Sequence, residues 1–118
     1  FRSLRAFDGV GSFIAGQIVA DAKNTRGSEW YHTEDWFDFV VPGPGSRRGL
    51  ARLLCKPAPY TLSDKEFYAN FHVASDAALE IYGELCNQDI QNCLCEFDKY
   101  MRVKLGEGKP RQRYMESA

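Results

Sequence analysis

Residues 7 to 18 decide the fold expected of this chain, and they read Phe7-Asp8-Gly9-Val10-Gly11-Ser12-Phe13-Ile14-Ala15-Gly16-Gln17-Ile18. From Ser12 to Asn24 the apolar residues recur as one stripe of an amphipathic helix, which holds Ile14, Ala15, Ile18, Val19 and Ala22. We expect Ser12 to be the N-cap of this helix. Arg2 to Phe7 indicates the end of an earlier helix, and Asp8 to Gly11 a tight connection in which glycine lets the backbone turn. The stretch therefore predicts a helix-hairpin-helix.

Such a hairpin offers a means of binding DNA. Its glycines let backbone N–H groups at the start of a helix approach a phosphate, often with the help of a bound monovalent cation. This contact does not depend on the base sequence. We therefore expect Gly9, Val10, Gly11 and Ser12 to bind DNA. The alternative is a purely structural connection between two helices.

A loop rich in glycine and proline leads into a basic segment. Pro42-Gly43-Pro44-Gly45 is expected to interrupt regular structure, and Ser46 to cap a helix from Arg47 to about Leu54. A helix start with free backbone donors and two guanidinium groups suits phosphate or pyrophosphate. Residues 43–49 are accordingly the strongest candidate anion-binding site of the chain. The alternative is a connecting loop followed by a basic surface turn.

The second half of the chain is also predicted to be helical. Ser63-Asp64-Lys65-Glu66 has the capping-box pattern, so that a helix starts at Asp64. Leu62 and Phe67 have the spacing of a hydrophobic staple at the same helix start. Helical patterning resumes over Asp76 to Leu85 and over Asp89 to Lys104.

Two segments give a different signal. Trp36 to Val41 is either a short helix or an extended buried segment, and Gly106 to Ala118 indicates a tail or an extended arm. The chain is expected to be one domain, with the hairpin, the loop and the basic helix in residues 1–56 and the later helices and basic tail in residues 57–118. Because it begins at Phe1 inside a patterned segment, we interpret it as a fragment or a processed piece.

The composition is that of a soluble globular protein. Of the 118 residues, 44% are hydrophobic and 26% are charged. No apolar run approaches the roughly 20 residues that a membrane-spanning helix needs, so we expect no membrane partner. The four cysteines and two histidines lack metal-ligand spacing, and no metal site is predicted from them. Free thiols indicate a reducing compartment.

The charges are segregated along the chain. The net charge is −1, yet two blocks are basic, Arg47 to Lys56 and Lys99 to Arg113. Both blocks are suited to a polyanion, and Lys99 and Arg102 are expected to contact DNA. Asp64 to Asp98 is acidic and is typical of a solvated helical face. The alternative for each charged run is solubility.

Four side chains are candidates for the chemistry of a site. Gln17 and Asp21 lie one helical turn apart, and Glu34 and Asp38 lie just upstream of the glycine- and proline-rich loop. A carboxylate near an anion-binding turn can orient or deprotonate a nucleophile or bind Mg²⁺. For each of the four, the alternative is a solvated surface position.

Four blocks of the sequence resemble the α-glutamyl/putrescinyl thymine pyrophosphorylase family, which lies within the helix-hairpin-helix DNA-glycosylase-like superfamily. The blocks are Gly9-Val10-Gly11-Ser12-Phe13-Ile14-Ala15-Gly16-Gln17-Ile18-Val19-Ala20-Asp21, Thr33-Glu34, Phe39-Val40-Val41-Pro42-Gly43-Pro44-Gly45-Ser46-Arg47-Arg48-Gly49-Leu50 and Leu94-Cys95-Glu96-Phe97-Asp98-Lys99-Tyr100. The resemblance implies a mostly α-helical, glycosylase-like domain that is incomplete at its N-terminus. It also implies hypermodification of a base in DNA.

In that family an amine displaces pyrophosphate from an activated 5-hydroxymethyluracil. The resemblance implies that Gly45, Ser46, Arg47 and Arg48 stabilise pyrophosphate, with Mg²⁺ as a possible companion. It places the candidate catalytic residues Gln17, Asp21 and Glu34 in the base pocket, and Asp38 where a glycosylase aspartate falls. The implied activity is that of a transferase, and the implied partners are DNA, an amino acid or polyamine, and another chain or an upstream segment that completes the fold.

Two other functions are kept open. A base-excision glycosylase would carry a lysine late in the hairpin's second helix or an aspartate after the loop, and Lys23 and Asp38 are imperfect equivalents. A non-catalytic DNA-binding module would use the hairpin and the two basic blocks alone. In each case the expected location is intracellular and follows the DNA, in the nucleus of a eukaryote or in the cytoplasm of a bacterium or of a phage-infected cell.

Overall fold

The computed structural model describes residues 1–108, and every regular element in this range is helical. Four α-helices, α1 (Ser12–Asn24), α2 (Pro44–Leu53), α3 (Asp64–Tyr82) and α4 (Asn87–Lys104), follow one another with three short 3₁₀ helices, η1 (Leu4–Ala6), η2 (Glu29–His32) and η3 (Glu34–Phe37). The mostly α-helical fold class is thus confirmed. None of the helices described is long and apolar enough to cross a membrane. The predicted tail or arm lies mainly outside the described range.

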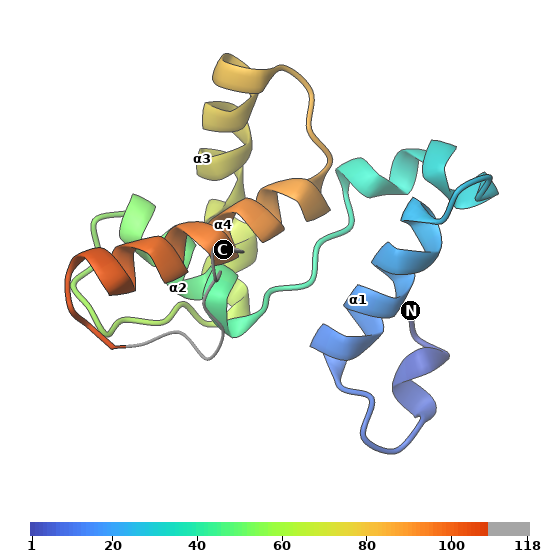
Figure 1. Cartoon of the computed structure of the whole chain (residues 1–118), viewed down its shortest axis with the longest axis horizontal. Coiled ribbons are helices and arrows are strands. Elements are labelled where there is room, and N and C mark those ends of the chain that lie inside the picture. Colours follow the sequence, from blue (N-terminus) through green and yellow to red (C-terminus); the bar gives the residue numbers. More distant parts are fainter. Residues whose placement is uncertain (109–118) are drawn as a thin grey trace, which may run out of the picture.

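The helices form two groups that are joined by a strap, residues 38–43, which begins with a turn at Asp38 and then runs without regular structure (Figure 1). α1 packs against η1 and η2, whereas α2 packs between α3 and α4. The main core belongs to the second group and consists of Val40, Leu50, Ala51, Leu62, Phe67, Phe71, Ala74, Ile90 and Leu94. Val40 of the strap is part of that core, and it connects the α1 group to the second group of helices.

The hairpin is shorter at its N-terminal side than the sequence predicts. The expected first helix is the single 3₁₀ turn η1, and Gly9 makes the turn with a φ of +80°. α1 has the predicted bounds, but its N-cap is Gly11, and Ser12 is the first helical residue. Ser12 therefore does not cap the helix with its side chain.

The buried face of α1 is also rotated from the predicted stripe. Ile14 and Ile18 are 47% and 41% exposed, and the buried residues of the helix are Ala15, Gly16, Ala20 and Lys23. Small residues face inward because the strap lies close to the helix: a Cβ on Gly16 would lie 3.2 Å from the Cβ of Val41. The apolar stripe alone does not show which side a neighbouring segment will cover.

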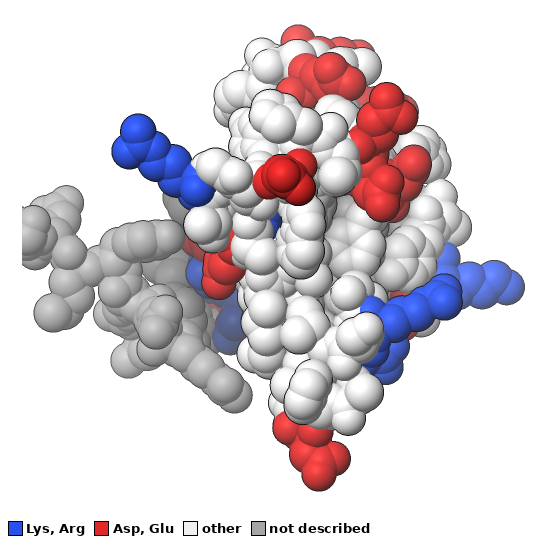
Figure 2. Space-filling view, turned by 90° about the vertical axis from the view of Figure 1, so that its right-hand side faces the viewer, with Lys and Arg blue, Asp and Glu red and all other residues white. Residues whose placement is uncertain are grey.

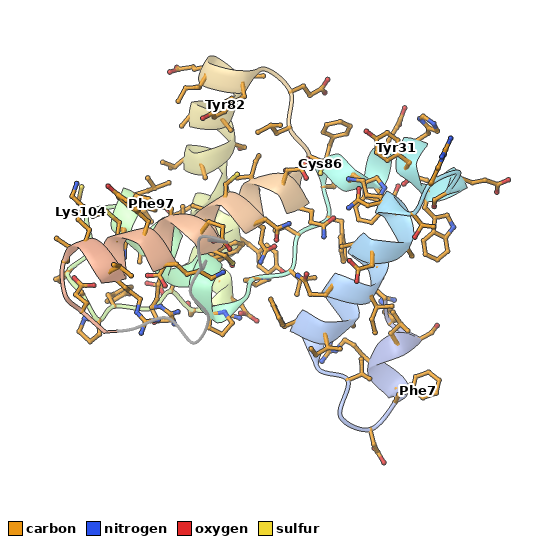
Figure 3. The ribbon with its side chains drawn as sticks, in the orientation of Figure 1. Phe7, Tyr31, Tyr82, Cys86, Phe97 and Lys104 are labelled. Atoms are coloured by element: carbon orange, nitrogen blue, oxygen red, sulfur yellow. The ribbon has the colours of Figure 1, made fainter. Side chains whose placement is uncertain are left out.

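A buried lysine links α1 to the start of α4. Lys23 is 6% exposed, and its Nζ donates a hydrogen bond to Cys86 Sγ at 3.1 Å and lies 4.6 Å from the centre of the Trp36 ring. Cys86, the N-cap residue of α4, in turn donates to Asp89 Oδ2 at 3.0 Å. Figure 3 shows Cys86 where α4 begins, beside the 3₁₀ helices. The lysine thus fills a structural position between the two groups.

α2 starts three residues earlier than predicted. Gly43 is its N-cap and Pro44 its first residue, because proline at this position needs no N–H donor. Ser46 lies inside the first turn, where its Oγ accepts from Gly43 N–H at 2.9 Å and its hydroxyl donates to Gly43 C=O at 3.1 Å. The prediction that residues 42–45 interrupt regular structure is therefore wrong for Pro44 and Gly45.

The later helices agree more closely with the sequence. The capping box at the start of α3 is confirmed, since Glu66 N–H donates to Ser63 Oγ and Ser63 N–H donates to Glu66 Oε2. Leu62 and Phe67, the predicted staple, are both buried. The two expected helical stretches after Asp64 are one continuous helix, and α4 begins two residues before Asp89. Between residues 36 and 41, the chain is first a 3₁₀ helix and then extended.

Candidate functional site

The hairpin projects from the molecule with its backbone accessible. A Cβ added to Gly9 or Gly11 would meet no atom within 4 Å, so another molecule can approach the backbone closely there. No side chain caps the N-terminus of α1. The first N–H groups of an uncapped helix are free to bind an anion. Phe7 lies beside this turn and is 67% exposed (Figure 3).

The outer face of the α1 group carries few charges at its centre. Figure 2 shows this face as largely uncharged, with lysine and arginine at its sides and acidic groups at its upper and lower ends. The exposed apolar side chains of the hairpin and α1 include Phe7, Ile14 and Ile18. The positive charge that DNA requires is therefore not spread over this face.

A cavity of about 370 Å³ lies at the base of the hairpin, and we call it the hairpin pocket. It brings together three residues that the sequence proposed separately, Ser12 of α1, Asp38 of the strap and Arg47 of α2. The remaining lining residues are Phe1, Arg5, Phe39, Val40, Val41, Pro42, Asp64 and Tyr68. The strap thus forms a wall between the hairpin and the main helical core.

Arg47 is held in place by several partners. Its guanidinium forms an ion pair with Asp64 and donates hydrogen bonds to Leu62 C=O at 3.2 Å and Pro42 C=O at 3.5 Å. The Arg47 side chain is 23% exposed, so it still faces the cavity. These contacts connect the strap, α2 and the start of α3. A cation positioned in this way loses little conformational freedom when it binds an anion.

Tyr68, which also lines the hairpin pocket, holds the strap by a hydrogen bond. Its hydroxyl donates to Val40 C=O at 3.2 Å. Burial, together with the nearby Asp64 carboxylate, raises the pKa of Tyr68, and the neighbouring Arg47 partly counteracts this shift. A raised pKa keeps the phenol protonated near neutral pH, so that it stays a hydrogen-bond donor.

The walls of the hairpin pocket supply three kinds of chemistry. Arg5 and Arg47 are cations, whereas Asp38 is an exposed carboxylate that can accept a proton. Phe39 adds an aromatic surface, and its ring packs edge to face with that of Phe1 at a centroid distance of 5.3 Å. Cations beside a proton acceptor and an aromatic surface suit a planar ligand that carries or receives a phosphate.

The four predicted pyrophosphate-binding residues do not face one cavity. Ser46 is fully buried and uses its hydroxyl to cap α2, and a Cβ on Gly45 would lie 3.3 Å from Cys95 Sγ. Arg47 faces the hairpin pocket, but Arg48 faces the other side of α2 and binds Asp98 with its Nε at 2.8 Å. Neighbouring helical residues diverge by about 100° around the axis, which separates the two guanidinium groups.

The four candidate catalytic residues are not assembled together either. Asp38 lines the hairpin pocket, while Asp21 and Glu34 are exposed and do not line it. Gln17 lies on the other side of the strap, in a narrow crevice with Gln88 and Gln91 of α4. The expectation that Gln17, Asp21 and Glu34 share one pocket therefore does not agree with the structure.

The crevice beside Gln17 contains an unsatisfied polar atom. Gln88 is 9% exposed, and its Oε1 has no hydrogen-bond partner among the described residues. The space there is about 10 Å³, which is the room that one water molecule needs. In this conformation the crevice is too small for a base.

The two predicted DNA-contacting residues of α4 have different surroundings. Lys99 binds Glu96 with its Nζ 2.5 Å from Oε1, one turn along the same helix. Arg102 lines a second cavity together with Arg48.

Three residues of the hairpin pocket, Arg5, Asp64 and Tyr68, were not predicted as site residues from the sequence, because each lies in a different segment and no local pattern distinguishes it. No cluster of metal-binding side chains occurs in residues 1–108.

Residues 1–110 of the chain match the family model described as "5-hmdU DNA kinase, helical domain". No curated protein and no solved structure matches the chain. The match confirms a helical domain that is connected with DNA modification at 5-hydroxymethyluracil. It does not support the pyrophosphorylase family, which the sequence motifs had indicated.

Proposed function

Because the chain belongs to the family of 5-hmdU DNA kinase helical domains, we propose that it binds DNA and holds a 5-hydroxymethyluracil base in the hairpin pocket. The observation that carries this proposal is the convergence of Ser12, Asp38 and Arg47 on one cavity directly below an exposed hairpin. The hairpin would hold the backbone, and the pocket would receive the base. Both features come from separate parts of the chain and meet at the strap.

The size and walls of the hairpin pocket support a base as its ligand. Its volume of about 370 Å³ lies within the range of small-molecule sites, which is roughly 300–1,000 Å³. Enzymes that modify a base in duplex DNA turn it out of the helix and hold it against aromatic or apolar side chains. Phe39 and Val41 offer such surfaces here. The hairpin N–H groups would bind the neighbouring phosphate.

Asp38 is the residue that we propose for proton transfer. In phosphorylation of the base, the 5-hydroxymethyl oxygen forms a bond to phosphorus and loses its proton, while the bond from phosphorus to the donor's leaving oxygen breaks. The Asp38 carboxylate would accept that proton. Arg5 and Arg47 would stabilise the phosphate charge from the same cavity.

A second reaction suits the same residues, namely displacement of pyrophosphate from an activated 5-hydroxymethyluracil by an amine. The observation in its favour is that Arg5, Arg47 and the carboxylate of Asp38 share one cavity, whose second carboxylate, Asp64, is paired with Arg47. The cations would stabilise the departing pyrophosphate, and Asp38 would take the proton that the amine loses as the C–N bond forms. The two reactions give products of different mass.

Binding to matched duplexes tests the proposal. The full chain is titrated with fluorescent duplexes that contain thymine or 5-hydroxymethyluracil at one position, over a series of salt concentrations. We expect tighter binding to the hydroxymethylated duplex. The Phe39→Ala variant should reduce that preference while leaving non-specific binding intact. Equal binding to both duplexes at every salt concentration would contradict base recognition and leave a module that binds phosphates.

Mass analysis of the nucleosides then separates the possible reactions. The duplex is incubated with the full chain and a nucleoside triphosphate, or the pyrophosphorylated duplex with the chain and an amine. The Asp38→Asn variant should bind DNA but lose product formation. Asp21→Asn is the matched control, since it removes the same charge from an exposed position outside the hairpin pocket. Release of free base would instead indicate a glycosylase.

A further inference from the structure

A second cavity, of about 440 Å³, lies on the opposite side of α2 from Arg47, and we call it the basic cavity. Four segments form it: α2, the loop after α2, the last turn of α4 and the turn that follows α4. Its polar lining consists of Arg48, Arg52, Lys56, Tyr60, Arg102 and Glu107. The two basic blocks of the sequence, which are more than 40 residues apart, therefore supply a single cavity.

The buried carboxylate of Asp98 fixes the positions of two arginines of the basic cavity, Arg48 and Arg52. Asp98 is 1% exposed, and its Oδ2 and Oδ1 accept hydrogen bonds from Arg48 Nε at 2.8 Å and Arg52 Nε at 3.0 Å. The only side-chain hydrogen bond of Arg48 to a described residue is this one, made by its Nε. The two terminal nitrogens of the guanidinium therefore have no partner among the described residues. Asp98 is thus a positioning residue, and it leaves donors available to a ligand.

The charge of the basic cavity is not balanced by its own carboxylates. Four cations stand against Asp98 and Glu107, and Glu107 is already paired with Arg52. The Arg102 side chain forms no ion pair or hydrogen bond within residues 1–108, although its backbone oxygen accepts from Glu107 N–H at 2.9 Å. An uncompensated group of guanidinium and ammonium donors favours a multiply charged anion.

The remaining wall is aromatic and held in place. Tyr60 donates its hydroxyl to Glu66 Oε1 at 2.6 Å, and its ring centre lies 5.7 Å from Lys56 Nζ. The ring therefore lies beside the Lys56 ammonium, and its hydroxyl points to Glu66 of α3. The cavity has room for more than one phosphate group, because its volume lies within the range of sites for whole small ligands.

We propose that the basic cavity binds a ligand with two adjacent phosphate groups through Arg48, Lys56 and Arg102. Such a pair of phosphates occurs in free pyrophosphate and nucleoside polyphosphates, and successive phosphates occur along a nucleic-acid backbone. The proposal does not depend on base binding in the hairpin pocket, because the two cavities lie on opposite sides of α2.

Titration calorimetry with sodium pyrophosphate and binding of an unmodified duplex test this proposal on the full chain. The variants are Arg102→Ala and Lys56→Ala, which remove cations without leaving a buried carboxylate unpaired. Arg26→Ala is the matched control, since it removes an exposed cation from the loop after α1. Circular dichroism confirms that each variant is folded.

Two outcomes would support the proposal and identify the source of the phosphates. If pyrophosphate binds and Arg102→Ala weakens its affinity at least about tenfold, the ligand is a free polyphosphate. If only the duplex binds, Arg102→Ala should weaken it and lower the salt slope by about 1, which indicates a nucleic-acid backbone. The proposal is overturned if Arg102→Ala and Lys56→Ala bind both probes as the Arg26→Ala control does, or if neither probe binds the wild-type chain.

Discussion

The contact between α2 and α4 at Gly49 gives the most demanding test of the fold. A Cβ at Gly49 would lie 2.2 Å from Leu94 O and 2.8 Å from Leu94 C. Both sides of this contact are backbone, so no rotamer change can relieve it. Because α2 carries Arg47 toward one cavity and Arg48 toward the other, a displacement of this helix would disturb both sites.

The Gly49→Ala substitution forces the two helices apart. Ordinary carbon–oxygen contacts lie at about 3.3 Å or more, so Leu94 has to move by about 1 Å. Overpacking of this kind costs about 1–3 kcal/mol, and we take the upper end because backbone must move. Alanine regains about 1 kcal/mol of helix propensity over glycine. The expected net loss is about 2 kcal/mol, or about 8 °C in melting temperature at about 4 °C per kcal/mol.

Urea unfolding followed by circular dichroism measures this loss as a lower midpoint with an unchanged slope. Gly45→Ala is the control on the same helix, because the nearest atom to its added Cβ is a side-chain sulfur, Cys95 Sγ at 3.3 Å, and the nearest backbone atom lies at 3.4 Å. That variant should stay within about 0.5 kcal/mol of the wild type. A Gly49→Ala protein as stable as the wild type would refute the close approach of α2 and α4.

Two further predictions concern charged groups. Asp98→Asn should lower the free energy of unfolding by about 2–3 kcal/mol, measured in urea. Breaking a fully buried ion pair costs about 3–5 kcal/mol, and we expect less here because the arginine partners of Asp98 are partly exposed. The exposed Asp76→Asn control should change the free energy of unfolding little, and equal effects of the two substitutions would contradict the buried pair. The hydroxyl of Tyr60, together with the N–H and hydroxyl at the helix cap, lowers the pKa of Glu66 to about 2. Tyr60→Phe should raise that pKa in a carboxyl NMR titration. The stability that the low pKa supplies is present above about pH 4.5 and is lost as the pH falls toward 2. The difference in the free energy of unfolding between Tyr60→Phe and the wild type should therefore disappear near pH 2. If the pKa of Glu66 is the same in both proteins, the hydrogen bond from Tyr60 is contradicted.

Much of the helical framework could be predicted from local patterns. The bounds of α1 and the capped start of α3 agree with the sequence, because capping bonds and helical periodicity act over three or four residues. The rule that proline and glycine interrupt regular structure gave the wrong start for α2. Pro44 is accepted there because its first-turn position requires no donor.

The candidate site was predictable only in its parts. Ser12, Asp38 and Arg47 carry suitable chemistry in the sequence, but their meeting depends on the path of the strap. Arg47 and Arg48 look like one anion-binding turn, yet the rotation of the helix sends them into different cavities. The partners Asp64 and Tyr68 could not be named, because their role arises from packing between distant segments.

Local sequence patterns were therefore enough to establish a helical chain with a glycine hairpin, segregated charge and residues suited to phosphate chemistry. Tertiary packing decided which face of α1 is buried, that Gly49 serves a helix contact, and that the basic blocks at Arg48 and Arg102 share one cavity. The physical reason is the distance along the chain over which the interactions act. Caps and periodicity depend on neighbours within a helical turn, whereas cavities and close backbone contacts depend on how separate helices pack.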